Sequence, residues 1–357
     1  VDDYNDADLV LLNTCSIREN AHNKAFGMLG RLKHVKESTN PDLIVGLCGC
    51  MAQEEGVVSE LMHKYKWVNF VFGTHNIHRL PYILNEAIEK NKQQIEVLSR
   101  EGNIIEGIPV KRQSNYKAYV NIIYGCDKFC TYCIVPYTRG RERSLEVKRV
   151  IELANKFVSN GHKEIVLSGI HTGRYGRDLN TNLTHLLKEL LKVDGLERIR
   201  ISSIEMNEIT DELIELMVQD KRIARHLHIP VQSCSNGVLK RMNRPYTIEE
   251  FKERVSYIRR VLPNISISTD IIAGFADESD SEHEETISNV NEIGFSFMHV
   301  FPYSKRDGTV ASKMSQIHGT IRKNRAHQLN EISKLNRLFM LVMKKSVYLK
   351  YNNWPTL

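Results

Sequence analysis

The stretch Gly125-Cys126-Asp127-Lys128-Phe129-Cys130-Thr131-Tyr132-Cys133 contains three cysteines at spacings of four and then three residues. Thiolates are the soft ligands that iron-sulfur clusters and zinc require. Structural zinc sites and ferredoxin clusters take four protein ligands, yet the next cysteine, Cys234, lies about a hundred residues downstream. The stretch therefore predicts a cluster that is held by three thiolates and keeps one iron open for chemistry. The alternatives are three buried structural cysteines, or a zinc site completed by a distant histidine.

The sequence around this stretch alternates strands with helical segments. One strand is predicted directly before Cys126, and five more follow Cys133 with helical segments between them. Right-handed βαβ crossovers between such units close into a partial barrel, whose functional groups lie on the loops after the strands. The predicted fold class is α/β, with a (βα)6 partial TIM barrel over residues 117–320. The expected strands are 118–124, 164–168, 198–202, 227–231, 265–271 and 295–300.

Residues 1–95 are expected to form a separate, small parallel α/β domain. Cys15 and Cys50 follow its first two strands, and ligand sites of parallel sheets gather at such strand ends. We interpret Cys48 as a thiol of the core, with a metal ligand as the alternative. The expected strands are 9–12, 43–47 and 69–72, and the expected helices are 18–36 and 54–64.

The remaining segments are a linker and a carboxy-terminal extension. Residues 96–116 lack a clear period and contain Gly102, Gly107 and Pro109, which predicts a linker. A long basic helix is expected from about 321 to 351, within an extension over 321–357. Because the chain opens on valine and quickly enters a strand, we expect an amino-terminal domain that is truncated at its start.

The composition fits two folded domains and no membrane span. The 357 residues are 41% hydrophobic, and no apolar run approaches the roughly 20 residues of a membrane helix. Seven cysteines, an odd and grouped set, favour metal ligation in a reducing compartment, so a cytoplasmic protein is expected. The formal charge of +6 permits a polyanionic partner, and Arg139, Arg141 and Arg143 directly follow the cysteine stretch. Exposed basic residues of this kind also commonly form a solvated surface.

The CxxxCxxC spacing resembles the signature of the radical S-adenosylmethionine (SAM) enzymes, in which the open iron chelates the amino and carboxylate groups of SAM. Together with Asn13-Thr14-Cys15 and Cys48-Gly49-Cys50-Met51, it is similar to the methylthiotransferase family. The resemblance implies two 4Fe-4S clusters and a (βα)6 barrel. A third cysteine of the second cluster lies, in the family, upstream of the strand that opens this sequence, and it is missing here. The implied ligands are Cys126, Cys130 and Cys133 for the barrel cluster, and Cys15 and Cys50 for the second.

Loops after the barrel strands supply the candidates for contacts with SAM, the cofactor that the resemblance implies. Such loops offer glycines for close backbone approach and polar groups for the ribose and the amino acid. Each polar candidate could equally be a loop cap or a satisfied core residue. Tyr132 is placed to pack near the adenine or against the barrel, and His171 and His228 are given no role. The candidates are Gly169, Ser203, Glu205, Gln232 and Asp270.

The resemblance also implies an activity, addition of a methylthio group to C2 of an N6-modified adenosine 37 in the tRNA anticodon loop through a 5′-deoxyadenosyl radical. The amino-terminal motifs and Tyr124-Gly125-Cys126 look like enzymes acting on N6-isopentenyladenosine. Gly169-Ile170-His171-Thr172-Gly173 and Arg200-Ile201-Ser202-Ser203 look more like relatives acting on N6-threonylcarbamoyladenosine. The implied partners are tRNA and an electron donor such as flavodoxin or ferredoxin, and we expect a monomer.

Two other functions fit the same residues. One is a protein that keeps a cluster for structure and binds RNA without turnover, and the other is methylthiolation of a ribosomal-protein aspartate. Family members usually end in a small RNA-binding β-domain. Segment 321–357 shows no such strand pattern, so this domain is expected to be absent and tRNA binding to be weaker.

Overall fold

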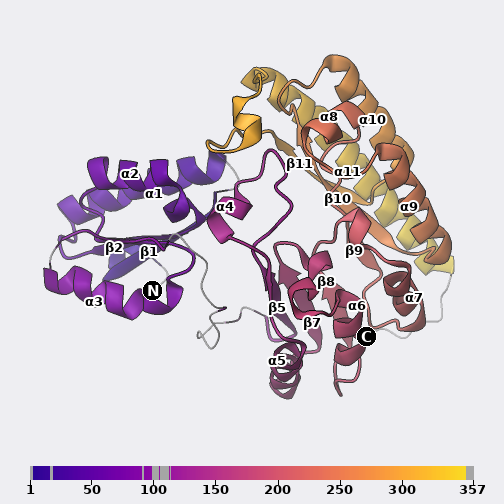
Figure 1. The fold of residues 1–357 in the computed structure, drawn as a ribbon, viewed down its shortest axis with the longest axis horizontal. Coiled ribbons are helices and arrows are strands. Elements are labelled where there is room, and N and C mark those ends of the chain that lie inside the picture. Colours follow the sequence, from indigo (N-terminus) through magenta and orange to yellow (C-terminus); the bar gives the residue numbers. More distant parts are fainter. Residues whose placement is uncertain are drawn as a thin grey trace.

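The structure is a computed structural model that describes residues 3–16, 19–90, 92–98, 104, 112 and 114–350. Most of the expected linker lies outside the described residues. The remainder forms an amino-terminal α/β unit and a larger, open barrel (Figure 1). Within the described residues, no helix combines the length and the hydropathy needed to cross a membrane.

The amino-terminal sheet is entirely parallel, with the strand order β1-β2-β3-β4. Two helices pack on one face of the sheet and a third packs on the other (Figure 1). The three predicted strands and both predicted helices are present, but β4 and α3 were not predicted. A three-residue strand is too short to show a period. The elements are β1 (Leu9–Thr14), α1 (Glu19–Ser38), β2 (Ile44–Gly49), α2 (Glu55–Lys64), β3 (Phe70–Phe72), α3 (Leu80–Lys90) and β4 (Gln94–Glu96).

Six parallel strands form the partial barrel, as predicted. They fall into two sheets, β5-β7-β8 and β9-β10-β11, and the backbone N–H of Ala224 donates to Ile199 O across the seam. A two-residue strand, β6 (Arg143–Ser144), adds antiparallel pairing at the edge of β5. The barrel strands are β5 (Lys117–Tyr124), β7 (Glu164–Gly169), β8 (Arg198–Ile201), β9 (His226–His228), β10 (Ser266–Ala273) and β11 (Phe297–Pro302).

Several predicted strand boundaries differ from the structure by one or two residues, and the largest error is at β9. The sequence predicts a strand over 227–231, whereas β9 ends at His228. Pro230 has no N–H to donate to a ladder, so regular pairing stops before it. The chain nevertheless remains beside β10, because the N–H of Gln232 donates to Asp270 O at 2.9 Å.

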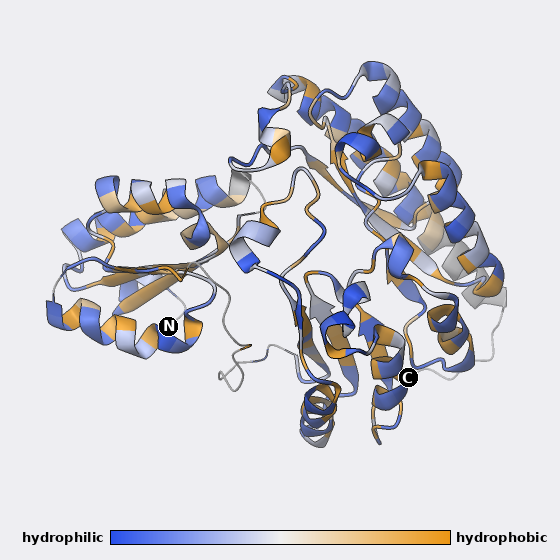
Figure 2. Ribbon diagram, in the orientation of Figure 1, coloured by the Kyte–Doolittle hydropathy of each residue, from blue (hydrophilic) through white to orange (hydrophobic). Residues whose placement is uncertain are grey.

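Helices cover the outside of the barrel strands and bury a continuous apolar core (Figure 2). Two of them begin at capping boxes, Thr247 with Glu250 and Ser279 with Glu282, and these boxes satisfy otherwise unpaired N–H groups. The helices are α4 (Val135–Arg139), α5 (Val147–Ser159), α6 (Leu183–Leu190), α7 (Asp211–Gln219), α8 (Asn236–Arg241), α9 (Ile248–Val261), α10 (Asp280–Ile293) and α11 (Gly319–Lys350).

Truncation of a core strand residue should destabilise the barrel. Leu167 on β7 is fully buried in the barrel core, so Leu167→Ala leaves a cavity and should lower the free energy of unfolding by about 2–5 kcal/mol. Urea unfolding followed by circular dichroism measures this change. Leu335 on α11 is 65% exposed, and the matched control Leu335→Ala should change stability by less than about 0.5 kcal/mol. Equal effects of the two substitutions would contradict the core described here.

Candidate metal centre

The cysteine loop leaves β5 through a turn that requires glycine. Gly125 has a φ of 71°, and a Cβ at this position would lie 2.0 Å from Arg141 O. The backbone of Cys126 then donates to Gly140 O at 3.1 Å. Farther along the loop, Thr131 is tied to the end of α8 through hydrogen bonds to Arg241 O and Met242 O. The loop is therefore fixed at both ends.

The three thiols of the loop lie close enough to interact electrostatically. Burial raises the pKa of Cys133 to about 12, with smaller contributions from Cys130 and Cys126. Burial likewise raises the pKa of Cys126 to about 11, with Cys130 contributing. Thiols with such pKa values stay protonated at neutral pH unless a cation binds them. Three neighbouring soft donors on one loop, two of them with raised pKa values, fit an iron-sulfur cluster.

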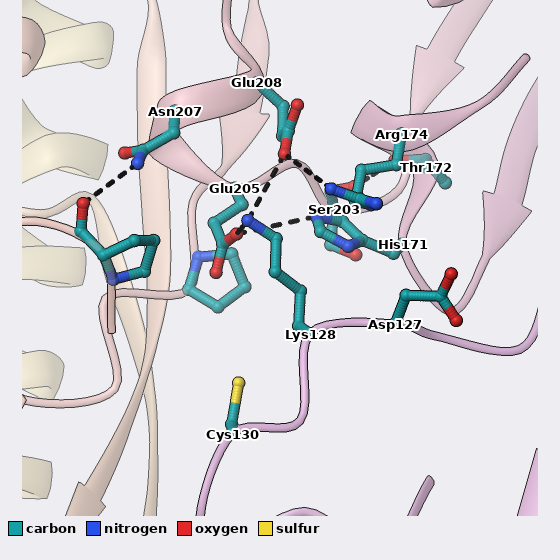
Figure 3. A network of polar contacts seen from close by, with 12 residues as sticks. Asp127, Lys128, Cys130, His171, Thr172, Arg174, Ser203, Glu205, Asn207 and Glu208 are labelled. Carbon is teal, nitrogen blue, oxygen red and sulfur yellow. Dashed lines mark hydrogen bonds and ion pairs between the residues drawn. The ribbon is translucent and has the colours of Figure 1, made fainter. Parts of the chain in front are cut away.

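A buried ionic network holds the cysteine loop in place. Figure 3 shows the Lys128 side chain extending from the cysteine loop to two carboxylates, with Nζ 2.7 Å from Glu205 Oε2 and 3.4 Å from Glu208 Oε1. Arg244 Nη1 lies 2.6 Å from Glu205 Oε1 and 3.5 Å from Cys130 Sγ. Burial alone would raise the pKa of Glu205, but the charges of Arg244 and Lys128 outweigh it and lower that pKa. Glu205 is therefore an ionised anchor.

A second carboxylate extends the network. Glu142 accepts from Arg174 Nε at 2.6 and 2.7 Å and from the backbone N–H of Asp127 at 3.1 Å. Burial opposes its ionisation, but the contacts with His171 and Arg174 lower the pKa of Glu142 to about 2. The His171 ring lies between the two acids, with Nδ1 3.6 Å from Glu142 and Nε2 3.7 Å from Glu205.

A cavity of about 440 Å³ adjoins the cysteine loop on the barrel side. Tyr132 and Cys133 line it together with Gln232 and Asp270. Asp270 Oδ2 lies 3.3 Å from Nε2 of His228, which shares the cavity. Two of the predicted cofactor-binding candidates thus lie beside the third cysteine, in a space that can hold a small molecule.

The other three predicted candidates lie elsewhere. Glu205 belongs to the ionic network that contacts Lys128 of the cysteine loop. The Ser203 carbonyl accepts a hydrogen bond from the Thr172 hydroxyl. Gly169 packs against β5, where a Cβ would lie 2.5 Å from Ile123 Cγ2.

Sequence reasoning missed several residues of the network. Lys128 and Asp127 enter the sequence prediction only as part of the cysteine stretch, and Arg244 has no role in it. A charged residue inside an otherwise partly buried metal loop is the signal that could have found Lys128, since a buried charge needs a partner. Nothing in the sequence pairs Lys128 with Glu205 and Glu208 specifically.

Cys15 and Cys50 lie at the ends of neighbouring strands. Thr14 of β1 pairs with Gly49 of β2 in the parallel sheet. Cys15 and Cys50 directly follow these two residues. Cys15 is exposed and Cys50 is buried. Cys48 packs in an apolar cluster with Phe70, as its interpretation as a core thiol predicts, and burial raises its pKa to about 11.

Helix α4 joins this pair of cysteines to the barrel. Arg139 Nε donates to Cys50 Sγ at 3.1 Å, and Thr74 Oγ1 donates to Thr138 O at 3.0 Å. In Figure 1, α4 lies between the amino-terminal unit and the barrel. The helix thus contacts Cys50 of the second pair, and it begins two residues after Cys133 of the cysteine loop.

A larger cavity of about 860 Å³ opens between the two units. Residues adjacent to both cysteine sets line it, including Gly49, Thr74 and Gly125. Among the described residues, its walls contain no acidic side chain but four arginines, which favours an anionic ligand. The arginines are Arg112, Arg139, Arg143 and Arg149.

The fold also resembles solved structures. A radical SAM methyltransferase, TsrM, from Kitasatospora setae matches with a TM-score of 0.60 and 12% identity over 87% of this chain and 65% of that chain. The cobalamin-dependent SAM radical enzyme OxsB gives 0.54 at 15% identity, over 85% of this chain and 46% of that chain. Residues 120–290 match the Radical SAM superfamily, and residues 1–73 match the uncharacterized protein family UPF0004. Barrel and cysteine loop together define a protein of the radical SAM class.

Curated relatives specify the family. A tRNA-2-methylthio-N(6)-dimethylallyladenosine synthase of Geobacillus thermodenitrificans is 47% identical over 92% of this chain and 63% of that protein. The protein of the same name from Bacillus cytotoxicus is 49% identical over 92% of this chain and 65% of that protein. The chain belongs to the radical SAM methylthiotransferase family. It spans slightly less than two thirds of the length of these relatives.

Membership implies a 4Fe-4S cluster and SAM as cofactors, and the residues fit them. The three neighbouring thiols suit the cluster, and the cavity beside Cys133 suits a small polar ligand. For a second cluster the structure offers Cys15 and Cys50 at adjacent strand ends.

Loss of the Glu142 charge should destabilise the chain in a pH-dependent way. Glu142→Gln should cost about 1–3 kcal/mol at pH 7, because Arg174 loses its ionic partner. A lowered carboxyl pKa adds stability above the ordinary value of 4.5, and this stability is lost as pH falls toward about 2. The difference between the two proteins should therefore be full at pH 7 and shrink below pH 4.5.

Urea unfolding at pH 7, 5 and 3 measures this trend. The control is Glu152→Gln, because Glu152 forms a surface pair with Arg149 and its side chain is 47% exposed. That substitution should change stability by less than about 1 kcal/mol at pH 7. A Glu142→Gln deficit that persists unchanged at pH 3 would contradict the role given to the carboxylate.

Proposed function

We propose that this chain is a tRNA methylthiotransferase that adds a methylthio group to C2 of N6-isopentenyladenosine 37. The observation that carries the proposal is the arginine-lined cavity, because residues next to both cysteine sets line it. A nucleotide entering this cavity would lie between the barrel loop and the strand ends of the amino-terminal sheet. The relatives named above carry dimethylallyladenosine, another name for the isopentenyl substrate, in their names, which favours it over the threonylcarbamoyl alternative.

Different residues of this chain would carry different parts of the reaction. Cys126, Cys130 and Cys133 would hold the barrel cluster, and Cys15 and Cys50 would contribute to the second. When bound, the barrel cluster reduces SAM and supplies a 5′-deoxyadenosyl radical. Reduction requires an external electron donor, for which a flavodoxin or a ferredoxin is proposed.

The protein itself orients and shields the reactants. Gln232 and Asp270, together with Tyr132, line the space next to Cys133, where SAM can bind. The Lys128 and Arg244 contacts to Glu205 keep the cysteine loop in one position before the cofactors bind. A loop that is already ordered does not lose conformational entropy when the cluster forms.

The charge of the larger cavity supports a polyanionic substrate. Arginines bind phosphate groups bidentately, and the described walls contain four arginines and no acidic side chain, although Arg149 pairs with Glu152 outside the walls. An adenosine of the anticodon loop must leave its stacked position before its C2 atom can react, as in other enzymes that act on a base. Binding should accordingly weaken as the salt concentration rises.

Mass spectrometry of tRNA nucleosides tests the proposal. In a strain lacking the gene, the 2-methylthio form of N6-isopentenyladenosine should be absent and the unmethylthiolated nucleoside should accumulate. Return of the gene should restore it. Loss of 2-methylthio-N6-threonylcarbamoyladenosine instead would establish the alternative substrate, and unchanged tRNA nucleosides would contradict both.

The cysteines should separate into two classes. Cys130→Ala removes one of three cluster ligands, so anaerobically reconstituted protein should lose about four irons per chain and form no 5′-deoxyadenosine with dithionite and SAM. Cys234 is fully buried in the barrel core and is not a proposed ligand. Cys234→Ala should therefore retain the iron content and the formation of 5′-deoxyadenosine. The reverse result would overturn the ligand assignment.

A further inference from the structure

We propose that Phe129 and Tyr137 form a stacking platform for a second nucleobase of the RNA loop, next to the nucleotide that enters the arginine-lined cavity. The inference rests on the proposed function and deepens it, because it assigns a contact with an unmodified neighbour of the target base. Neither residue takes part in the cluster, in the cavity beside Cys133 or in the ionic network.

The two rings are exposed and already paired. Phe129 is 41% exposed and Tyr137 is 55% exposed, and their ring centroids lie 5.8 Å apart with an interplanar angle of 83°. Single exposed apolar residues are common on protein surfaces, whereas exposed rings in contact with each other form a patch of the kind that marks binding sites. Bases of single-stranded RNA stack on such rings, whatever their sequence, because every base has a π-face.

The backbone holds Phe129 in this outward position at a cost. Its φ of 49° is unusual for a bulky residue, and Asn243, which has a φ of 58°, donates from Nδ2 to Phe129 O at 3.3 Å. This hydrogen bond thus joins two residues with left-handed backbone conformations from segments that are distant in sequence. Such conformations persist where the surrounding structure determines them, and they are frequent at ligand sites.

The position of the pair favours RNA as the occupant. Tyr137 lies on α4, and two residues later Arg139 lines the arginine-rich cavity. Arg141, whose side chain is 65% exposed, lies beyond α4 and pairs with Asp127 at 3.1 Å, two residues before Phe129. Aromatic rings bordered by arginines match the base and phosphate of one nucleotide. An electron-donor protein is the competing occupant.

Fluorescence of a modified RNA tests the platform. The probe is an RNA stem-loop with an N6-isopentenyladenosine in its single-stranded loop and 2-aminopurine on one side of it. Stacking quenches 2-aminopurine, so the full chain should quench it upon binding. In Phe129→Leu/Tyr137→Ala, the quenching should disappear and the Kd should rise about tenfold or more.

The matched control is Tyr82→Ala. Tyr82 is 54% exposed and lies under Arg79, but on α3 of the amino-terminal unit, so its loss should leave quenching and Kd unchanged. Iron content after reconstitution checks the cysteine loop. If Phe129→Leu lowers the iron content, the single variant Tyr137→Ala is used to test the platform, because Tyr137 lies outside the cysteine loop.

Three results would overturn the platform. The double variant could bind and quench like the unaltered chain. It could keep RNA binding and quenching but lose reduction by flavodoxin while dithionite still reduces it, which would assign the surface to the electron donor. Failure of the unaltered chain to bind the RNA at low salt would instead refute the RNA substrate itself, and the platform with it.

Discussion

The ion pairs between Lys128 and the two carboxylates of Glu205 and Glu208 are the constraint on which the site depends. A lysine placed inside a partly buried metal loop must find a negative partner, because an unpaired charge in that setting would cost several kcal/mol. The partners come from the segment after β8, and Arg244 adds a second positive charge from the segment after α8. Three segments that are distant in sequence are thereby fixed against one another before any cofactor binds.

This network also explains where the positive charge of the protein is available. In the ionic network beside the cysteine loop, Glu142 forms an ion pair with Arg174 and Glu205 forms one with Arg244, so these charges are compensated. In the described walls of the large cavity, arginines are present without acids. The two sides of the cysteine loop therefore differ in kind: one side is neutralised and rigid, while the other can attract phosphate groups. Separation of these roles would let one loop hold the proposed metal cluster and face the proposed RNA substrate.

The fold followed from the sequence more completely than the site did. All six barrel strands were predictable, because each is a short segment with buried apolar residues between helical segments, and Pro230 accounts for the largest boundary error. Gln232 and Asp270 also share a cavity, because Gln232 follows β9 and its N–H donates to Asp270 O within the neighbouring strand β10. Glu205 follows β8 as Gln232 follows β9, yet it belongs to the network, since its contacts depend on Lys128 and Arg244. No local pattern encodes which lysine meets which carboxylate after about eighty residues of intervening chain.

Helix α4 shows how the two units depend on each other. Its five residues are too few for a helix that is stable by itself, although Pro136 in its first turn favours the start. Its order must therefore come from its contacts, and these lie on both sides: Thr138 and Arg139 bind residues of the amino-terminal unit, and Cys133 of the barrel loop precedes it closely. A change in the packing of the amino-terminal unit should consequently reach the barrel loop through α4. The two cysteine sets are thus connected through the contacts of α4 as well as by the cavity that residues next to both of them line.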